Sequence, residues 1–153
     1  MNLTLPSTDF GVDIPFVQHL GLVLTVCANG ASEVRLTPRP EFLNSFGVAH
    51  GGVIMTLLDV AMAMAARSEL MHTGAVTIEM KTTFMRPSVG TLVARGRVIQ
   101  NTATLAFTEA SVFDEHDKLC AHATGTFKYV RRLVSGTRQM HDLNRSSVPV
   151  APD

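Results

Sequence analysis

The chain has 153 residues, of which 46% are hydrophobic and 17% charged, and this composition suits a single globular domain with a sizeable core. Thirteen basic residues balance thirteen acidic ones, and the zero net charge argues against nucleic acid or an anionic membrane as the main partner. The two cysteines are too few for a disulfide framework and indicate a reduced, cytoplasmic protein. We expect neither a signal peptide in residues 1–11 nor a membrane span in the apolar stretch 53–66.

The first elements of the chain are predicted to be a short helix and a hairpin. Asp13 before an Ile-Pro start is typical of an N-cap with proline in the first turn, so we expect a helix over residues 14–20. Two runs of β-branched and aliphatic residues, 22–28 and 31–37, then flank the pair Asn29-Gly30. Such a pair between strand-like runs is a strong hairpin signal.

A long apolar segment over residues 53–71 has the length and the Ala, Leu and Met content of a helix. Its apolar residues lie on nearly all sides, which predicts a helix buried nearly all round, in the middle of a wrapped sheet. Four strand-like runs joined by short turns follow and predict antiparallel pairing; they cover residues 75–85, 91–100, 104–113 and 118–130.

This order of elements indicates one α+β domain over residues 1–134. Residues 135–153 lose the hydrophobic periodicity and gain Ser, Pro and Asn, which predicts a flexible C-terminal tail.

One acid, Asp59, interrupts the long apolar segment. No Lys or Arg lies within a helical turn of it, and its neighbours on the helical face are apolar. A carboxylate is costly to bury unless it is paired, hydrogen-bonded or protonated. Asp59 therefore has two possible roles. In a structural role it lies on a solvent-exposed stripe of the helix or pairs with a buried basic group; in a functional role it acts as a general base or a nucleophile.

A polar loop that contains His50-Gly51-Gly52 directly precedes the helix. Glycine N–H groups at the positive end of a helix dipole are unpaired and form an anion or oxyanion site, although an ordinary capped turn would have the same sequence. Asp59 lies nine residues after His50, about two and a half helical turns. Since that is too far for Asp59 to reach its own loop, we expect a neighbouring subunit to supply the loop.

The spaced motif Asn44-x5-His50-Gly51-Gly52-x6-Asp59 resembles the hotdog-fold acyl-CoA thioesterases of the phenylacetate-pathway type, within the 4-hydroxybenzoyl-CoA thioesterase superfamily. Residues 76–80, 84–90 and 104–107 are also similar to that family. The resemblance implies a hotdog fold, in which an antiparallel sheet wraps around one long central helix. It further implies hydrolysis of an acyl- or aryl-acyl-CoA to a free acid and coenzyme A, with no metal or separate cofactor.

Five positions match the catalytic residues of that family. By this resemblance, Asp59 is the general base or nucleophile, and the Gly51 N–H polarises the thioester carbonyl. Asn44 orients the water or the carbonyl, His50 supports the loop beside the thioester, and Thr77 assists the water. In family members the Asp and Thr come from one subunit and the Asn, His and Gly from its partner. The resemblance therefore implies a homodimer with shared active sites, assembled as a dimer of dimers.

For the substrate, the resemblance points to the loop glycine, the end of one strand, a strand connection and a late lysine. These residues are Gly52, Phe84, Arg86, Gln100, Asn101, Thr102, Ala103, Thr104, Leu105 and Lys128. Methionines are usually core fillers, but several of them flank Asp59 and suit a flexible acyl pocket. They are Met55, Met62, Met64, Met71, Met80 and Met85.

Two other functions stay open at this point. A hotdog enoyl-thioester hydratase or dehydratase would need a different arrangement of His and acid, and product analysis would separate it. A non-catalytic, acyl-CoA-binding regulatory module usually has an attached DNA-binding segment, for which residues 1–13 are too short. No His, Cys and Asp residues have metal-ligand spacing, and Ser45 is not in a Gly-x-Ser-x-Gly context.

Overall fold

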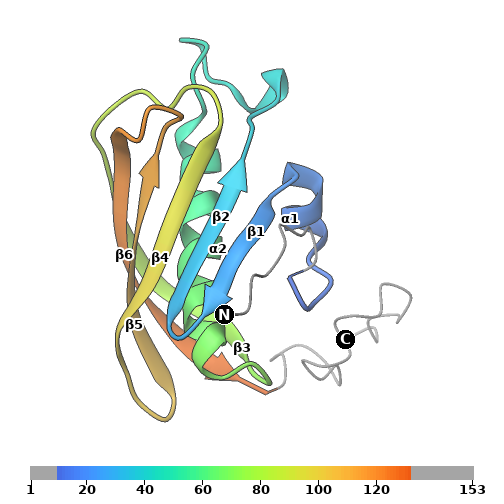
Figure 1. Ribbon diagram of the computed structural model, residues 1–153, viewed down its shortest axis with the longest axis vertical. Helices are drawn as coiled ribbons and strands as arrows, with labels where there is room; N and C mark the ends of the chain where they lie inside the picture. Colours follow the sequence, from blue (N-terminus) through green and yellow to red (C-terminus); the bar gives the residue numbers. More distant parts are fainter. Residues whose placement is uncertain (1–9, 132–153) are drawn as a thin grey trace.

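Six antiparallel strands curve around one long helix in the computed structural model, which describes residues 10–131 (Figure 1). The sheet has the order β1-β2-β4-β5-β6-β3, and every neighbouring pair is antiparallel. The strands are β1 (Val23–Ala28), β2 (Ala31–Leu36), β3 (Gly74–Phe84), β4 (Leu92–Asn101), β5 (Leu105–Phe113) and β6 (Leu119–Val130). The helices are α1 (Pro15–Leu20), α2 (Gly51–Glu69) and the short 3-10 turn η1 (Pro40–Phe42). The predicted α+β hotdog fold is confirmed, and the predicted tail over residues 135–153 lies outside the described residues.

The early elements follow their local signals, with one exception. Asn29 and Gly30 both have positive φ, 52° and 75°, as a tight hairpin turn between right-twisted strands requires. Gly21 ends α1 in the left-handed conformation. The prediction that Asp13 is the N-cap was wrong. Ile14 holds that position, and no side-chain hydrogen bond caps the helix. Since Pro15 lacks an N–H, one of the donors that a cap would satisfy is absent.

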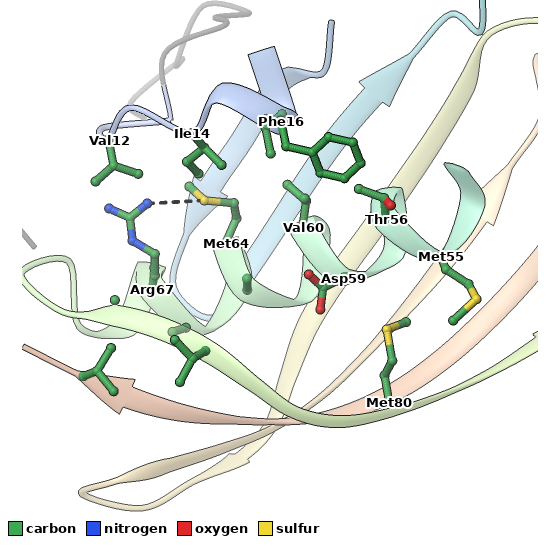
Figure 2. Close-up of a pocket in the computed structure, with 16 residues that line it drawn as sticks. Val12, Ile14, Phe16, Met55, Thr56, Asp59, Val60, Met64, Arg67 and Met80 are labelled. Atoms are coloured by element: carbon green, nitrogen blue, oxygen red, sulfur yellow. Dashed lines mark hydrogen bonds between the residues drawn. The ribbon is translucent and has the colours of Figure 1, made fainter. Parts of the chain in front are cut away.

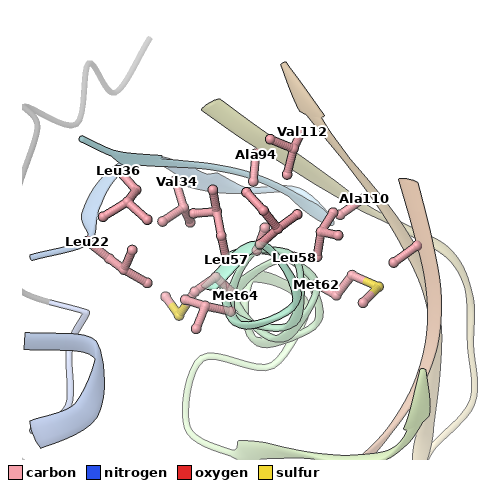
Figure 3. Close-up of a cluster of buried hydrophobic side chains, with 14 of the residues drawn as sticks. Leu22, Val34, Leu36, Leu57, Leu58, Met62, Met64, Ala94, Ala110 and Val112 are labelled. Carbon is pink, nitrogen blue, oxygen red and sulfur yellow. The ribbon is translucent and has the colours of Figure 1, made fainter. Parts of the chain in front are cut away.

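The central helix packs one side against the sheet, here called the sheet-facing side. Leu57, Leu58 and Met62 lie on it, and each is fully buried (Figure 3). The backbone of α2 comes so close to β4 that a Cβ on Gly96 would lie 2.6 Å from the Ala61 carbonyl oxygen, so only glycine fits there. Ser32 on β2 donates to the same oxygen at 2.6 Å and fixes the helix on the sheet.

Two predictions about α2 were wrong. The helix covers Gly51–Glu69 rather than 53–71, because the side chain of His50 caps it two residues earlier. It is also not buried nearly all round: Met55 is 40% exposed, and Asp59 and Ala63 on the same stripe are only partly covered. By length and composition α2 would be able to cross a bilayer, but the core helix of a folded domain meets the same criteria, and here α2 packs within the curved sheet.

Candidate active site

Asp59 projects from the uncovered stripe of α2 towards β3 and is held there by Thr77. The Thr77 hydroxyl donates to Asp59 Oδ1 at 2.6 Å. A bulge in the pairing of β3 with β6 follows Thr77 at once, because Thr77 pairs with Phe127 and Glu79 with Thr126, which leaves Ile78 as the extra residue. Bulges re-aim side chains next to functional sites. The structure thus brings together two of the predicted catalytic residues, 18 positions apart in the chain.

A cavity of about 480 Å³, here called the Asp59 cavity, lies in front of this pair. Side chains of α1, α2 and β3 form its walls, and Figure 2 shows Phe16, Met55 and Met80 around the Asp59 carboxylate. Burial raises the pKa of Asp59 above its ordinary value, and the Thr77 hydrogen bond opposes part of that rise. Oδ2 of the carboxylate is left to accept from a water or a substrate.

The loop before α2 borders a second cavity of about 390 Å³, here called the Gly51 cavity. Asn44, Gly51, Phe84 and Arg86 all line it, so the structure brings these four predicted residues together. Asn44 Oδ1 accepts from the backbone N–H groups of residues 46 and 48 at 2.9 and 3.3 Å, which shapes the loop. Arg86 is tied by a bond of 2.9 Å from Nη1 to the carbonyl oxygen of Leu119.

The two glycines of the loop differ in what their N–H groups do. His50 Nδ1 accepts from the Gly52 N–H at 2.9 Å, so the prediction that both groups are unpaired was wrong for Gly52. Within residues 10–131, the N–H of Gly51 donates to no acceptor. It stands in the first turn of a 19-residue helix, where the dipole favours negative charge. His50 therefore caps the helix, and Gly51 holds the available donor.

Of the predicted substrate residues, Phe84 and Arg86 line the Gly51 cavity. The connection between β4 and β5 and Lys128 lie instead at the other end of α2 from Gly51 (Figure 1). The connection between β4 and β5 is closed by its own bonds: Thr102 Oγ1 accepts from the N–H groups of Thr104 and Leu105 at 3.3 and 3.0 Å. Lys128 on β6 pairs with Leu105 on β5 and is exposed, so the structure does place this cation beside the connection. Gln100, Asn101 and Ala103 are exposed as well.

The predicted site residues thus fall into three groups, and within one chain these groups lie apart from one another. From Gly51 to Asp59 the helix rises about 12 Å, and the two residues border different cavities. Six methionines were expected to fill the core, with several of them near Asp59 also lining an acyl pocket; Met55, Met64 and Met80 line the Asp59 cavity. Met85 lines the Gly51 cavity instead, Met62 lies in the core, and Met71 is 53% exposed.

Arg67 is a residue of the Asp59 cavity that the sequence reasoning missed. It is 5% exposed and lies eight positions after Asp59. Residues four and eight positions apart share one helical stripe, so the spacing Asp59, Ala63, Arg67 was the signal that would have found it. Among the residues that the structure describes, no group of three His, Cys, Asp or Glu side chains is placed to hold a metal ion, and both cysteines are free thiols.

Comparisons with known proteins agree with this fold. The family model "Thioesterase superfamily" matches residues 46–121, which run from the Gly51 loop to β6. The curated protein named "Putative esterase SSO2140", from Saccharolobus solfataricus, is 31% identical over 69% of this chain and 76% of its own length. The chain belongs to the thioesterase superfamily.

Solved structures give the same result. The conserved protein PA5202 from Pseudomonas aeruginosa superposes with a TM-score of 0.74 and 31% identity over 78% of this chain and 97% of that one. A mutant form of the phenylacetic acid degradation protein PaaI from Thermus thermophilus superposes with a TM-score of 0.69 and 30% identity, over 75% and 98% of the two chains. The resemblance to hotdog thioesterases of the phenylacetate-pathway type is therefore confirmed at the level of family and fold.

Proposed function

We propose that the protein is an acyl-CoA thioesterase that hydrolyses an acyl- or aryl-acyl-CoA to the free acid and coenzyme A. The observation that carries this proposal is Asp59: a carboxylate with a raised pKa, held by Thr77 at the wall of an apolar cavity. A desolvated carboxylate is a stronger base than one in water. The apolar walls suit the acyl group, and membership of the thioesterase superfamily supports the reaction class.

In the proposed reaction, Asp59 acts as general base through Oδ2. It takes a proton from a water while the water oxygen attacks the thioester carbonyl carbon, and the carbonyl oxygen becomes an oxyanion. A Gly51 N–H donates to that oxyanion, aided by the helix dipole. The C–S bond then breaks, and the thiolate of coenzyme A receives the proton from Asp59. Nucleophilic attack by Asp59 itself is the competing route: it would expel the thiolate of coenzyme A and form a mixed anhydride between Asp59 and the acyl group. Attack of water on the Asp59 carbonyl of this anhydride would release the acid and put solvent oxygen into the Asp59 carboxylate in a single turnover in labelled water.

Because Asp59 and Gly51 of one chain border different cavities, the proposal includes a homodimer with shared sites. The strand β3 supports this arrangement: it has 11 residues, it ends the strand order of the sheet formed within residues 10–131, and its side chains are exposed on both faces over residues 76–79. If the β3 strands of two subunits pair about a two-fold axis, the two strands run in opposite directions. The Gly51 loop of one subunit then lies beside the sheet end of the other that carries Lys128, and two such dimers would form the proposed tetramer.

Release of free thiol from a panel of acyl- and aryl-acyl-CoA thioesters tests the function, with the wild type and Asp59→Asn compared. We expect turnover by the wild type and a loss of about 10²–10⁴-fold in the variant, the usual contribution of a positioned general base. Mass spectrometry of the products should show free acid, whereas a hydratase would change the mass of the intact thioester. A wild type that hydrolyses no thioester would refute the proposal.

A further inference from the structure

Arg67 places a buried positive charge in the wall of the Asp59 cavity. It projects from the last turn of α2 and is 5% exposed. Within residues 10–131 no carboxylate forms an ion pair with it. Cations of this kind are almost never buried unless an anion compensates them.

The bonds that Arg67 does make are to uncharged groups. Nη1 donates to the carbonyl oxygen of Phe10 at 2.9 Å and to Met64 Sδ at 3.5 Å, and Nε donates to the carbonyl oxygen of Thr73 at 3.3 Å. These bonds fix the position of the side chain, and no carboxylate within residues 10–131 compensates its charge. Burial lowers the pKa of Arg67, yet a guanidinium stays protonated in proteins. Among the residues that the structure describes, Arg67 is thus a fixed cation without a carboxylate partner.

The same cavity joins this cation to Asp59. Among its 16 lining residues, Asp59 and Arg67 are the only charged ones, and Thr56 is the only other with a polar side chain. Figure 2 shows the Arg67 guanidinium beside Met64 and Val12, and the Asp59 carboxylate farther along α2, on the side of β3. Eight residues of helix separate them by about 12 Å along the axis, and an arginine side chain leans back towards the helix N-terminus.

We propose that the acyl group hydrolysed by this protein carries a carboxylate at the end distant from the thioester, and that Arg67 binds this carboxylate. The planar guanidinium suits a carboxylate better than any neutral group. The apolar walls between the charges fit the aliphatic or aromatic body of such an acyl group. This inference rests on the proposed thioesterase function, since it places the thioester at Asp59.

A purely structural role for Arg67 makes different predictions. In that case the residue only ties Phe10 and Thr73 to the end of α2. Its replacement would then lower stability and lower the hydrolysis of every thioester in proportion. Binding of a terminal carboxylate requires instead that replacement lowers the hydrolysis of one class of substrate and leaves the other class little changed.

The test compares thioesters of matched length, suberoyl-CoA against octanoyl-CoA and adipoyl-CoA against hexanoyl-CoA. For at least one pair we expect the wild type to have a kcat/KM at least about tenfold higher for the diacid thioester, since a site built for a polar group discriminates against an analogue that lacks it. Arg67→Met should lower the ratio of diacid to monoacid kcat/KM to about one or below, and Arg67→Lys should restore part of the preference. Arg97→Met is the matched control: Arg97 is paired with Glu109 on the exposed face of the sheet, so its removal changes the net charge equally.

Equal or lower kcat/KM for both diacid thioesters in the wild type would overturn the inference, even if Arg67→Met does not fold. A parallel loss for all four substrates in Arg67→Met, with a lower melting temperature, would also overturn it. If no thioester is hydrolysed, the proposed function fails separately. Calorimetric binding of suberoyl-CoA and octanoyl-CoA then decides: tighter suberoyl-CoA binding that Arg67→Met abolishes supports the inference, and equal binding overturns it.

Discussion

The two sides of α2 are built from the same apolar sequence but meet different surroundings. On the sheet-facing side Leu57, Leu58 and Met62 are fully buried against the strands. The opposite side, here called the cavity-facing side, holds Met55, Asp59 and Arg67 and borders a cavity of about 480 Å³. These three side chains of the first side are apolar, whereas both charges of the Asp59 cavity are on the second side.

This difference indicates that one side of α2 stabilises the fold and the other side carries the groups that are proposed to react. Burying an apolar side chain contributes about 1.5–3 kcal/mol to folding, so the sheet-facing side holds the fold together. The cavity-facing side keeps charged groups out of water, which costs stability and makes their chemistry stronger. Substitutions on the sheet-facing side should therefore lower stability and leave hydrolysis little changed, and substitutions on the cavity-facing side should do the opposite.

The largest effect is expected on the cavity-facing side. Asp59→Asn should lower kcat/KM by about 10²–10⁴-fold and at the same time leave the protein at least as stable as the wild type. The sign follows from the raised pKa of Asp59. Because the folded state binds the proton more tightly than the unfolded state, the stabilising contribution is complete below the unfolded pKa and is lost as pH rises through the folded pKa.

In its ionised form Asp59 therefore destabilises the fold, and Asn removes this cost. Urea unfolding of both proteins at neutral and acidic pH measures the effect, and the gain from Asn should shrink as pH falls. A variant that loses stability at neutral pH would show that Asp59 is a structural residue.

The sheet-facing side should respond in the opposite way. Leu58 is fully buried, so Leu58→Ala should lower the free energy of unfolding by about 2–5 kcal/mol through lost burial and a residual cavity. Hydrolysis per folded molecule should change little, because Leu58 points away from the Asp59 cavity. Urea unfolding and thioester turnover on the same sample measure both, and a large loss of turnover with intact folding would contradict the division.

A smaller effect is expected where β3 meets the cavity-facing side. Thr77→Val removes the bond that opposes the pKa rise of Asp59, so the pKa should rise further. The acid limb of the profile of kcat/KM against pH should move to higher pH, with a loss of about tenfold at neutral pH for one charge-assisted hydrogen bond. Thr77→Ser keeps the hydroxyl and serves as the control. If the acid limb of Thr77→Val lies at the same pH as that of the wild type, Thr77 does not act on the pKa of Asp59.

Local signals in the sequence were sufficient for the fold. Asn29-Gly30 requires a tight turn, and a long proline-free apolar run predicts the central helix. The site was predictable only as a set of residue types, because its geometry depends on contacts between distant segments. The bond between Thr77 and Asp59 depends on a bulge at Ile78 that no local pattern indicates, and the pairing of the Gly52 N–H with His50 depends on one side-chain rotamer.

The proposed shared site would join the two cavities, and subunit mixing tests it most directly. Gly51→Pro removes the proposed oxyanion donor, and proline is tolerated in the first helical turn. Gly51→Ala keeps the N–H and has room, since its Cβ would lie 3.5 Å from Phe84, so it is the control. Alone, Gly51→Pro and Asp59→Asn should each be nearly inactive in thioester hydrolysis, and Gly51→Ala should be active.

When the two inactive variants are unfolded together and refolded as a mixture, half of the dimers should contain one subunit of each kind. Each such dimer has one site with an intact Asp59 and an intact Gly51, so the mixture should recover about a quarter of the wild-type rate of thioester hydrolysis. A mixture that refolds to dimers and stays as inactive as its two components would contradict the shared site.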